Sequence, residues 1–133
     1  MPTFVDLVTS RQAWIAEVLR PWCCSAAWKD LQLAEQEWLN LAGKVEPEGT
    51  LWAWAWSRFP GLVNTQTWRI DETHPISIKL TNGQTFDGYP DGRRSLQGKL
   101  LLLCRDQAQP RKFVDAGPFR IDEIVAMTML ETV

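Results

Sequence analysis

The segment Ile76–Tyr89, ISIKLTNGQTFDGY, decides the fold class of this chain. Apolar and polar residues alternate on each side of Asn82-Gly83, and this alternation is the pattern of a β-strand with one buried face. Asn-Gly between two such runs is a strong signal for a β-hairpin, because the tight turn needs positive φ angles that these residues accept. The segment therefore predicts two antiparallel strands that are joined at Gly83.

Three more short strands are expected after this hairpin. The nearly continuous apolar run Lys99–Cys104 predicts a buried strand, and Arg111–Val114 predicts a short fourth strand. A tight connection over residues 116–122 leads to Ile124–Leu130, whose place after four short strands favours a closing strand over a helix. Residues 64–133 are therefore expected to form a five-stranded small β-barrel.

The second half also resembles the Sm-like, SH3-like small barrels over residues 76–127. The resemblance is carried by the apolar, glycine and acidic positions of the first Sm motif, which correspond here to Ile78, Leu80, Gly83, Phe86, Gly88 and Asp91. It implies a strongly bent strand at Gly88, where a side chain would obstruct the bend. The Asn and the Arg-Gly that Sm proteins use to hold a base have no counterpart in 92–95 or around Arg120. The resemblance implies the fold, with RNA binding as a possible function.

The first half, residues 1–63, contains helical patterns. A helix capped at Thr9 is expected to run to Pro21, and a second is expected from Ser25 to Ala42, with Gly43 as its left-handed C-cap. All eight tryptophans lie between positions 14 and 68, and Trp14, Trp28 and Trp38 occupy helix faces that are expected to be buried. We expect an α+β protein in which both halves share one core, so that residues 1–133 form a single structural unit.

The segment 50–59, TLWAWAWSRF, fits either a strand or a helix. Its tryptophans alternate, but the intervening alanines, the capping-type Thr50 and the terminating Pro60 favour a short helix. Such a helix is either buried on two sides or displays an aromatic patch. Because exposed Trp and Arg are frequent in protein interfaces, five residues are candidates for partner binding. They are Trp52, Trp54, Trp56, Arg58 and Phe59.

Composition limits the classes of function. The formal net charge is −2, so the chain as a whole is not a polycation that would attract nucleic acid or anionic lipid. Its three cysteines lack the spacing of a disulfide framework, which favours free thiols in a reducing compartment. No apolar run is long enough to cross a bilayer, and the amino terminus has no signal-peptide pattern. A cytoplasmic location without membrane contact is therefore expected.

A local basic cluster is nevertheless present in the second half. Its positive groups would lie on loops and strand ends at one edge of the barrel, where Tyr89 could stack on a base. The candidate nucleic-acid-binding residues are Tyr89, Arg93, Arg94, Lys99, Arg105, Arg111 and Lys112. Ordinary surface charge is the alternative interpretation of this cluster.

No constellation of catalytic residues is evident. His74 is the single histidine, and with Asp71 or Glu72 it forms the only candidate for an enzyme centre. No motif indicates a metal or a cofactor. The sequence therefore favours a non-enzymatic module that binds another protein or itself, with RNA binding as the alternative and an enzyme using His74 as the second alternative.

Overall fold

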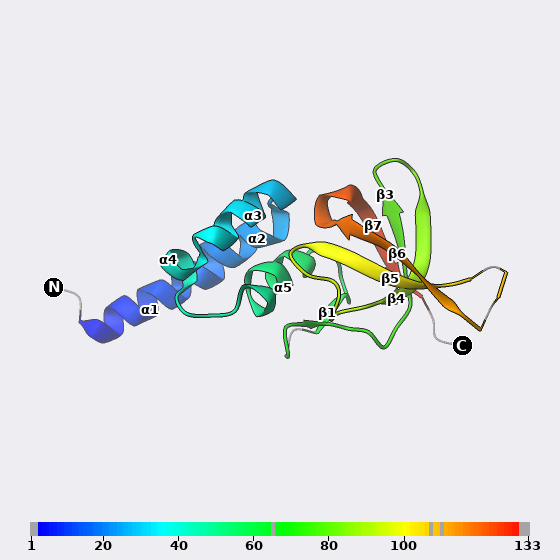
Figure 1. The fold of residues 1–133 in the computed structure, drawn as a ribbon. Coiled ribbons are helices and arrows are strands. Elements are labelled where there is room, and N and C mark those ends of the chain that lie inside the picture. Colours follow the sequence, from blue (N-terminus) through cyan, green and yellow to red (C-terminus); the bar gives the residue numbers. More distant parts are fainter. Residues whose placement is uncertain (1–2, 65, 107, 110, 131–133) are drawn as a thin grey trace.

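A computed structural model describes residues 3–64, 66–106, 108–109 and 111–130, so the ends of both expected halves, residues 1–2 and 131–133, lie outside the described residues. The chain begins with a long helical rod (Figure 1). The rod consists of α1 (Phe4–Trp14), the π-helical turn η1 (Ile15–Leu19) and α2 (Arg20–Ser25). Thr3 starts it with a capping box, in which its hydroxyl accepts from the Asp6 N–H at 3.1 Å while its own N–H donates to the Asp6 carboxylate at 3.0 Å.

The expected stop at Pro21 is wrong, because the rod continues through this proline to Ser25. In the π-helical turn the Arg20 N–H donates to the Ile15 carbonyl, five residues back instead of four. Pro21 then lies in the first turn of α2, where a residue without an N–H is tolerated.

The second expected helix is divided into two. Ser25 ends α2 instead of starting the next helix, and α3 (Trp28–Gln36) begins after two extended residues. Glu37, with φ −103°, separates α3 from α4 (Trp38–Ala42). Gly43 has the positive φ of +86° expected of a glycine after a helix, but its ψ of −164° lies outside the left-handed helical region, so the expected left-handed C-cap is not formed.

Segment 50–59 forms the expected short helix. The single 3-10 turn η2 (Pro47–Gly49) leads into α5 (Leu51–Trp56), so the alternating tryptophans are helical and not a strand. Helix α5 lies beneath the rod and beside the sheet (Figure 1), and it makes the link between the helices and the strands.

The second half contains a five-stranded antiparallel sheet, which confirms the α+β class. A small hairpin of β1 (Val63–Asn64) and β2 (Arg69–Ile70) precedes it. The sheet has the strand order β6-β5-β4-β3-β7. Its elements are β3 (Ile76–Leu80), β4 (Thr85–Pro90), β5 (Lys99–Arg105), β6 (Phe113–Arg120), the 3-10 turn η3 (Ile121–Glu123) and β7 (Ile124–Met129).

Gly83 acts as the hairpin pattern predicts, and Gly88 lies where the structure leaves no room for a side chain. Gly83 has φ +87° in the turn between β3 and β4. A Cβ atom on Gly88 would lie 2.6 Å from the carbonyl oxygen of Leu103, so β4 and β5 approach each other too closely for a side chain. The fourth strand was predicted too short, because β6 extends to Arg120 and the turn η3 replaces the expected connection that started at residue 116.

The buried hydrophobic cluster contains residues of both halves. Leu31, Trp38 and Trp52 come from the helices, and Leu100 and Ile121 come from the sheet. Polar contacts also join the halves at Trp28, whose backbone N–H donates to the Asp122 carboxylate at 3.1 Å and whose indole N–H donates to the Gln97 carbonyl at 2.8 Å. Asp122 thereby caps α3 from the other half of the chain.

Candidate interaction surfaces

The predicted partner-binding residues of α5 are buried. Trp52, Trp54, Trp56 and Phe59 retain 0%, 6%, 2% and 9% of their accessible surface. Of the two arrangements expected for this helix, the structure therefore has the one that is buried on two sides, and these rings form no surface patch. A protein partner could cover these rings only if the elements packed around α5 moved away, although Trp56 also lines a cleft beside the helix.

The tryptophans of α5 are held by specific contacts. The Trp54 ring meets the rings of Trp38 and Trp68 edge to face, with centroids 5.8 and 6.5 Å apart. The guanidinium of Arg20 lies 5.1 Å from the centroid of Trp54 and 5.3 Å from that of Trp68. The indole N–H of Trp52 donates to the Glu35 carboxylate. The indole N–H of Trp52 is thus satisfied inside the protein, which is the normal arrangement for a buried indole.

Arg58 also has a structural position. Its guanidinium donates to the carbonyl oxygens of Ala55 at 3.0 Å, Cys23 at 2.9 Å and Ala26 at 2.7 Å. Two of these carbonyls lie at the end of α2, where helical carbonyls lack partners of their own. Burial lowers the pKa of the Arg58 guanidinium below its ordinary value. This side chain therefore holds α2 against α5.

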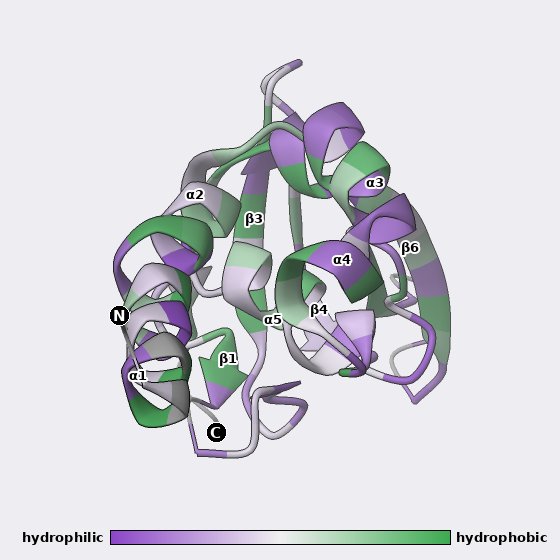
Figure 2. Ribbon diagram, turned by 90° about the vertical axis from the view of Figure 1, so that its left-hand side faces the viewer, coloured by the Kyte–Doolittle hydropathy of each residue, from purple (hydrophilic) through white to green (hydrophobic). Residues whose placement is uncertain are grey.

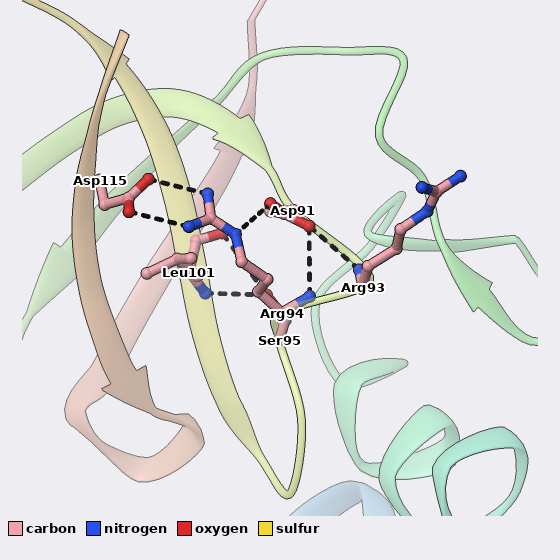
Figure 3. A network of polar contacts seen from close by, with 6 residues as sticks. All are labelled: Asp91, Arg93, Arg94, Ser95, Leu101 and Asp115. Carbon is pink, nitrogen blue, oxygen red and sulfur yellow. Dashed lines mark hydrogen bonds and ion pairs between the residues drawn. The ribbon is translucent and has the colours of Figure 1, made fainter.

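The basic residues of the second half do not gather at one place. Arg94 is the most constrained: its Nη1 and Nη2 each donate to the Asp115 carboxylate at 2.8 Å, and its Nε donates to Asp91 at 2.7 Å (Figure 3). Its hydrogen bonds lower the pKa of both carboxyl groups. Arg94 thus fastens the loop after β4 to β6, and each of its three nitrogens already donates to a carboxylate.

The other six candidates are distributed over several surfaces. Lys99 lies at the junction of the two halves, with Nζ 5.6 Å from the centroid of Trp28. Arg93 extends away from the Arg94–Asp115 pair (Figure 3) and lines a cleft beside α5. Arg111 and Lys112 lie on the connection between β5 and β6. The remaining two, Tyr89 and Arg105, line a separate groove.

That groove has a volume of about 580 Å³ and lies between the start of β4 and the end of β5. Tyr89 and Phe113 meet edge to face on it, with centroids 6.5 Å apart. The two strands are paired at Tyr89–Leu103 and Pro90–Leu102, so the pairing ends beside the groove. Tyr89 is therefore placed where it can contact a ligand, but of the six basic candidates only Arg105 lines the same groove.

His74 lies in an exposed loop. Its Nδ1 is 2.9 Å from the Thr73 hydroxyl and 3.3 Å from the Asp71 carboxylate. In a hydrolytic triad the nucleophile and the carboxylate contact opposite nitrogens of the imidazole. Here both contact the same nitrogen, so these three residues do not form such a relay. Within the described ranges, no group of three or more His, Cys, Asp or Glu residues is arranged to hold a metal ion.

A further apolar surface was missed by the sequence analysis. Trp14, Val18 and Trp22 lie one helical turn apart along the rod and are exposed to 39%, 52% and 39%. Trp14 was expected to be buried, which is wrong, since the rod contacts the body along another face that includes Leu19 and Cys23. The four-residue spacing was visible in the sequence, but the expected stop at Pro21 removed Trp22 from the pattern.

The rod projects from the body at its amino-terminal end (Figure 1), and apolar residues recur along α1 in the view from that side (Figure 2). Val5 and Val8 on α1 are exposed as well.

No helix in the described part of the chain is both long enough and apolar enough to cross a bilayer. Comparisons with protein-family models, with curated proteins and with solved structures gave no significant match.

Proposed function

We propose that the protein is a non-enzymatic interaction module that associates with a second copy of itself through the rod of α1, η1 and α2. The observation that carries this proposal is the exposed line of Trp14, Val18 and Trp22. Large aromatic side chains that remain in contact with water are costly, and covering them stabilises a complex. We call these three residues the rod stripe.

The rod stripe is symmetric in sequence, which favours a second copy as the partner. Four-residue steps separate Val18 from Trp14 on one side and from Trp22 on the other. If two rods cross in opposite directions at Val18, each Trp14 faces Trp22 of the other copy and the two valines face each other. The same patch is then complementary to itself, which is the requirement of a two-fold interface.

The projection of α1 supports the same proposal. Every side chain of α1 whose exposure the structure describes is exposed, so these residues gain little packing energy from the body. Isolated helices of this length are marginal in water and gain most of their stability from packing an apolar face. A second rod alongside would supply that packing.

The sheet is proposed to be a small SH3-like barrel of the Sm-like type. The strand order β6-β5-β4-β3-β7 and the short turn η3 before the last strand support this assignment, as does the close approach of Gly88 to Leu103. In this proposal the barrel supports the rod, and the three free thiols fit a cytoplasmic location.

RNA binding has less support. Arg94 is occupied by two carboxylates, and Arg93 and Arg105 line different cavities. Enzymatic use of His74 lacks a suitable geometry around the ring, because both neighbours contact Nδ1. Neither alternative has an observation comparable to the rod stripe.

Light scattering of the purified protein between about 10 and 200 µM tests the proposal, since an interface of a few side chains is expected to give a micromolar Kd. We expect a concentration-dependent dimer, and Val18→Glu should be monomeric because two carboxylates would meet at the symmetry axis. Leu33→Glu changes an equally exposed residue on α3 and should dimerise normally. A monomeric wild type, or a Val18→Glu dimer of unchanged affinity, would contradict the proposal.

Cross-linking tests the orientation of the rods. In the antiparallel arrangement Val18→Cys should form an intermolecular disulfide on mild oxidation, because the two positions face each other across the axis. Leu33→Cys and the wild type, which has three cysteines of its own, serve as controls. Equal yields of covalent dimer from Val18→Cys and Leu33→Cys would contradict the antiparallel arrangement.

A further inference from the structure

A second cavity lies where the two halves of the chain meet, on a different surface from the rod stripe. This junction cleft has a volume of about 400 Å³ and is lined by η2 and α5 on the helical side. Strand β2 and the loop after β4 line it on the sheet side. The volume is within the range of small-molecule sites, which lie preferentially where structural units meet.

The lining of the junction cleft combines an apolar floor with a charged rim. The floor includes Ala53, Trp56, Trp68 and Ile70. The rim has three carboxylates and two guanidiniums, namely Glu46, Glu48, Glu72, Arg69 and Arg93. A few convergent polar groups around an apolar surface are typical of a ligand site.

The charges of the rim are distributed unevenly. Glu46 and Glu48 come from the helical side, next to and within η2. Both guanidiniums come from the sheet side, Arg69 from β2 and Arg93 from the loop after β4. The side chain of Arg93 points away from the Arg94 network (Figure 3). Glu72, the third carboxylate, also lies on the sheet side, where its Oε1 is close to Gly92. The helical side therefore carries only negative charges, whereas the sheet side carries both guanidiniums and one carboxylate.

These rim charges are not paired with one another. In the part of the chain that the structure describes, the ion pairs within 4.0 Å involve His74, Arg94 and Arg120, and none joins two rim residues. Arg94 and Arg120, elsewhere in the sheet half, pair with carboxylates, whereas Arg69 and Arg93 do not pair with the carboxylates of the cleft. Charged groups arranged in this way are available to a ligand that carries both signs.

Glu48 is the least hydrated carboxylate of the rim. It is half-buried, and its Oε1 accepts the Gln97 N–H at 2.9 Å. Burial raises the pKa of the Glu48 carboxyl above its usual 4.5, the Gln97 N–H lowers it, and the negative charges of Glu35 and Glu46 raise it again. A cation beside Glu48 would relieve both the burial of its charge and this repulsion.

We propose that the junction cleft binds a small zwitterion of the amino acid class, with its ammonium group at Glu48 and Glu46 and its carboxylate at Arg93 or Arg69. The indoles of Trp56 and Trp68 then contact the aliphatic part or the ammonium group of the ligand. The requirement for both charges follows from the two sides of the rim. This inference does not depend on association through the rod.

Isothermal titration calorimetry with each of the twenty free amino acids tests the proposal. We expect saturable binding of at least one of them with a Kd below about 1 mM. Two derivatives of the best ligand each lack one charge: the N-acetyl derivative lacks the ammonium group, and the C-terminal amide lacks the carboxylate. Each should bind at least about tenfold more weakly than the free amino acid, because it loses one charge-assisted hydrogen bond. The absence of saturable binding by all twenty would overturn the proposal, and so would derivatives that bind as tightly as the free amino acid does.

Substitutions of cleft residues test whether the ligand binds in the cleft. Glu48→Gln retains an oxygen that accepts the Gln97 N–H, so the fold is preserved while the charge is removed. We expect this change and Arg93→Gln each to weaken binding about tenfold or more. Glu17→Gln, on the rod, should leave the affinity unchanged. If Glu48→Gln and Arg93→Gln both bind as the wild type does, the site is elsewhere and the proposal is wrong.

Discussion

The backbone of Gly98 lies directly against the indole of Trp52. A Cβ atom on Gly98 would be 2.5 Å from Cζ3 of Trp52 and 2.9 Å from Cδ1 of Trp28. The residue also has φ +73°, a conformation that side chains rarely adopt. The turn before β5 therefore docks onto two tryptophans of the helical half through a residue that must be glycine.

Gly98→Ala should destabilise the protein by at least about 2 kcal/mol, because the methyl group has no space and the backbone is strained. Chemical denaturation followed by circular dichroism measures the free energy of unfolding. Two other glycines separate the causes. Gly83→Ala adds only strain, since φ is +87° and no atom lies within 4 Å, and it should cost about 1 kcal/mol. Gly49→Ala adds neither backbone strain nor a steric clash, so its effect on stability should be close to zero. A Gly98→Ala protein as stable as Gly49→Ala would contradict the docking described.

Arg58→Met should cost about 3 kcal/mol of stability, because it leaves the Cys23 and Ala26 carbonyls without their donor while preserving most of the side-chain volume. Thermal denaturation is a suitable measurement. Arg111→Met, at an exposed arginine in the connection after β5, is the matched control and should change stability by less than about 0.5 kcal/mol. Equal effects of the two changes would mean that Arg58 is not a structural residue.

Asp91 should make the protein sensitive to acid. The hydrogen bonds from Arg94 hold the pKa of its carboxyl below the ordinary 3.8, so the unfolded chain takes up a proton before the folded one does. The stabilisation is therefore present above about pH 4 and is lost as the pH falls towards the lower folded pKa. Melting temperatures from pH 7 to pH 2.5 should fall less steeply for Asp91→Asn than for the wild type. Asp87→Asn, an exposed change on β4, should follow the wild-type curve, and parallel curves for all three proteins would refute the role of Asp91.

The strands were easier to predict from the sequence than the surfaces. Asn82-Gly83 fixes its hairpin locally, because the turn depends on the φ angles of adjacent residues. The helix boundaries at Pro21 and Ser25 were wrong, because the π-helical turn that accommodates the proline has no sequence signal of its own. Local patterns thus sufficed where the structure is determined by neighbours in sequence.

Burial depends on residues far apart in the chain, and there the predictions differ most from the structure. The α5 tryptophans are covered by α2 and by residues of the other half, none of which a pattern over residues 50–59 includes. Trp14 shows the reverse, because its helical pattern predicts burial but the body contacts another face of the rod. The junction cleft joins η2 to the loop after β4, so no single segment could have indicated it.

Glu48→Gln should stabilise the unliganded protein at pH 7 although it weakens the proposed site. Because the folded pKa of Glu48 is raised above 4.5, the folded state binds its proton more tightly than the unfolded state does. The protein is therefore most stable with respect to this group below pH 4.5, and it loses stability as the pH rises through the folded pKa. Glutamine resembles the protonated acid at every pH.

The difference in melting temperature between Glu48→Gln and the wild type should consequently be positive at pH 7 and close to zero near pH 4, with Glu17→Gln as the control for a carboxylate on the exposed rod. A lower melting temperature for Glu48→Gln at pH 7 would show that the ionised carboxylate stabilises the junction. In a binding site, a charged residue can reduce the stability of the empty protein and still contribute affinity for the ligand. This is expected because a bound cation supplies the countercharge that the empty site lacks. Stability and ligand affinity should therefore change in opposite directions at this one position, whereas Gly98→Ala and Arg58→Met should lower stability without this pH signature.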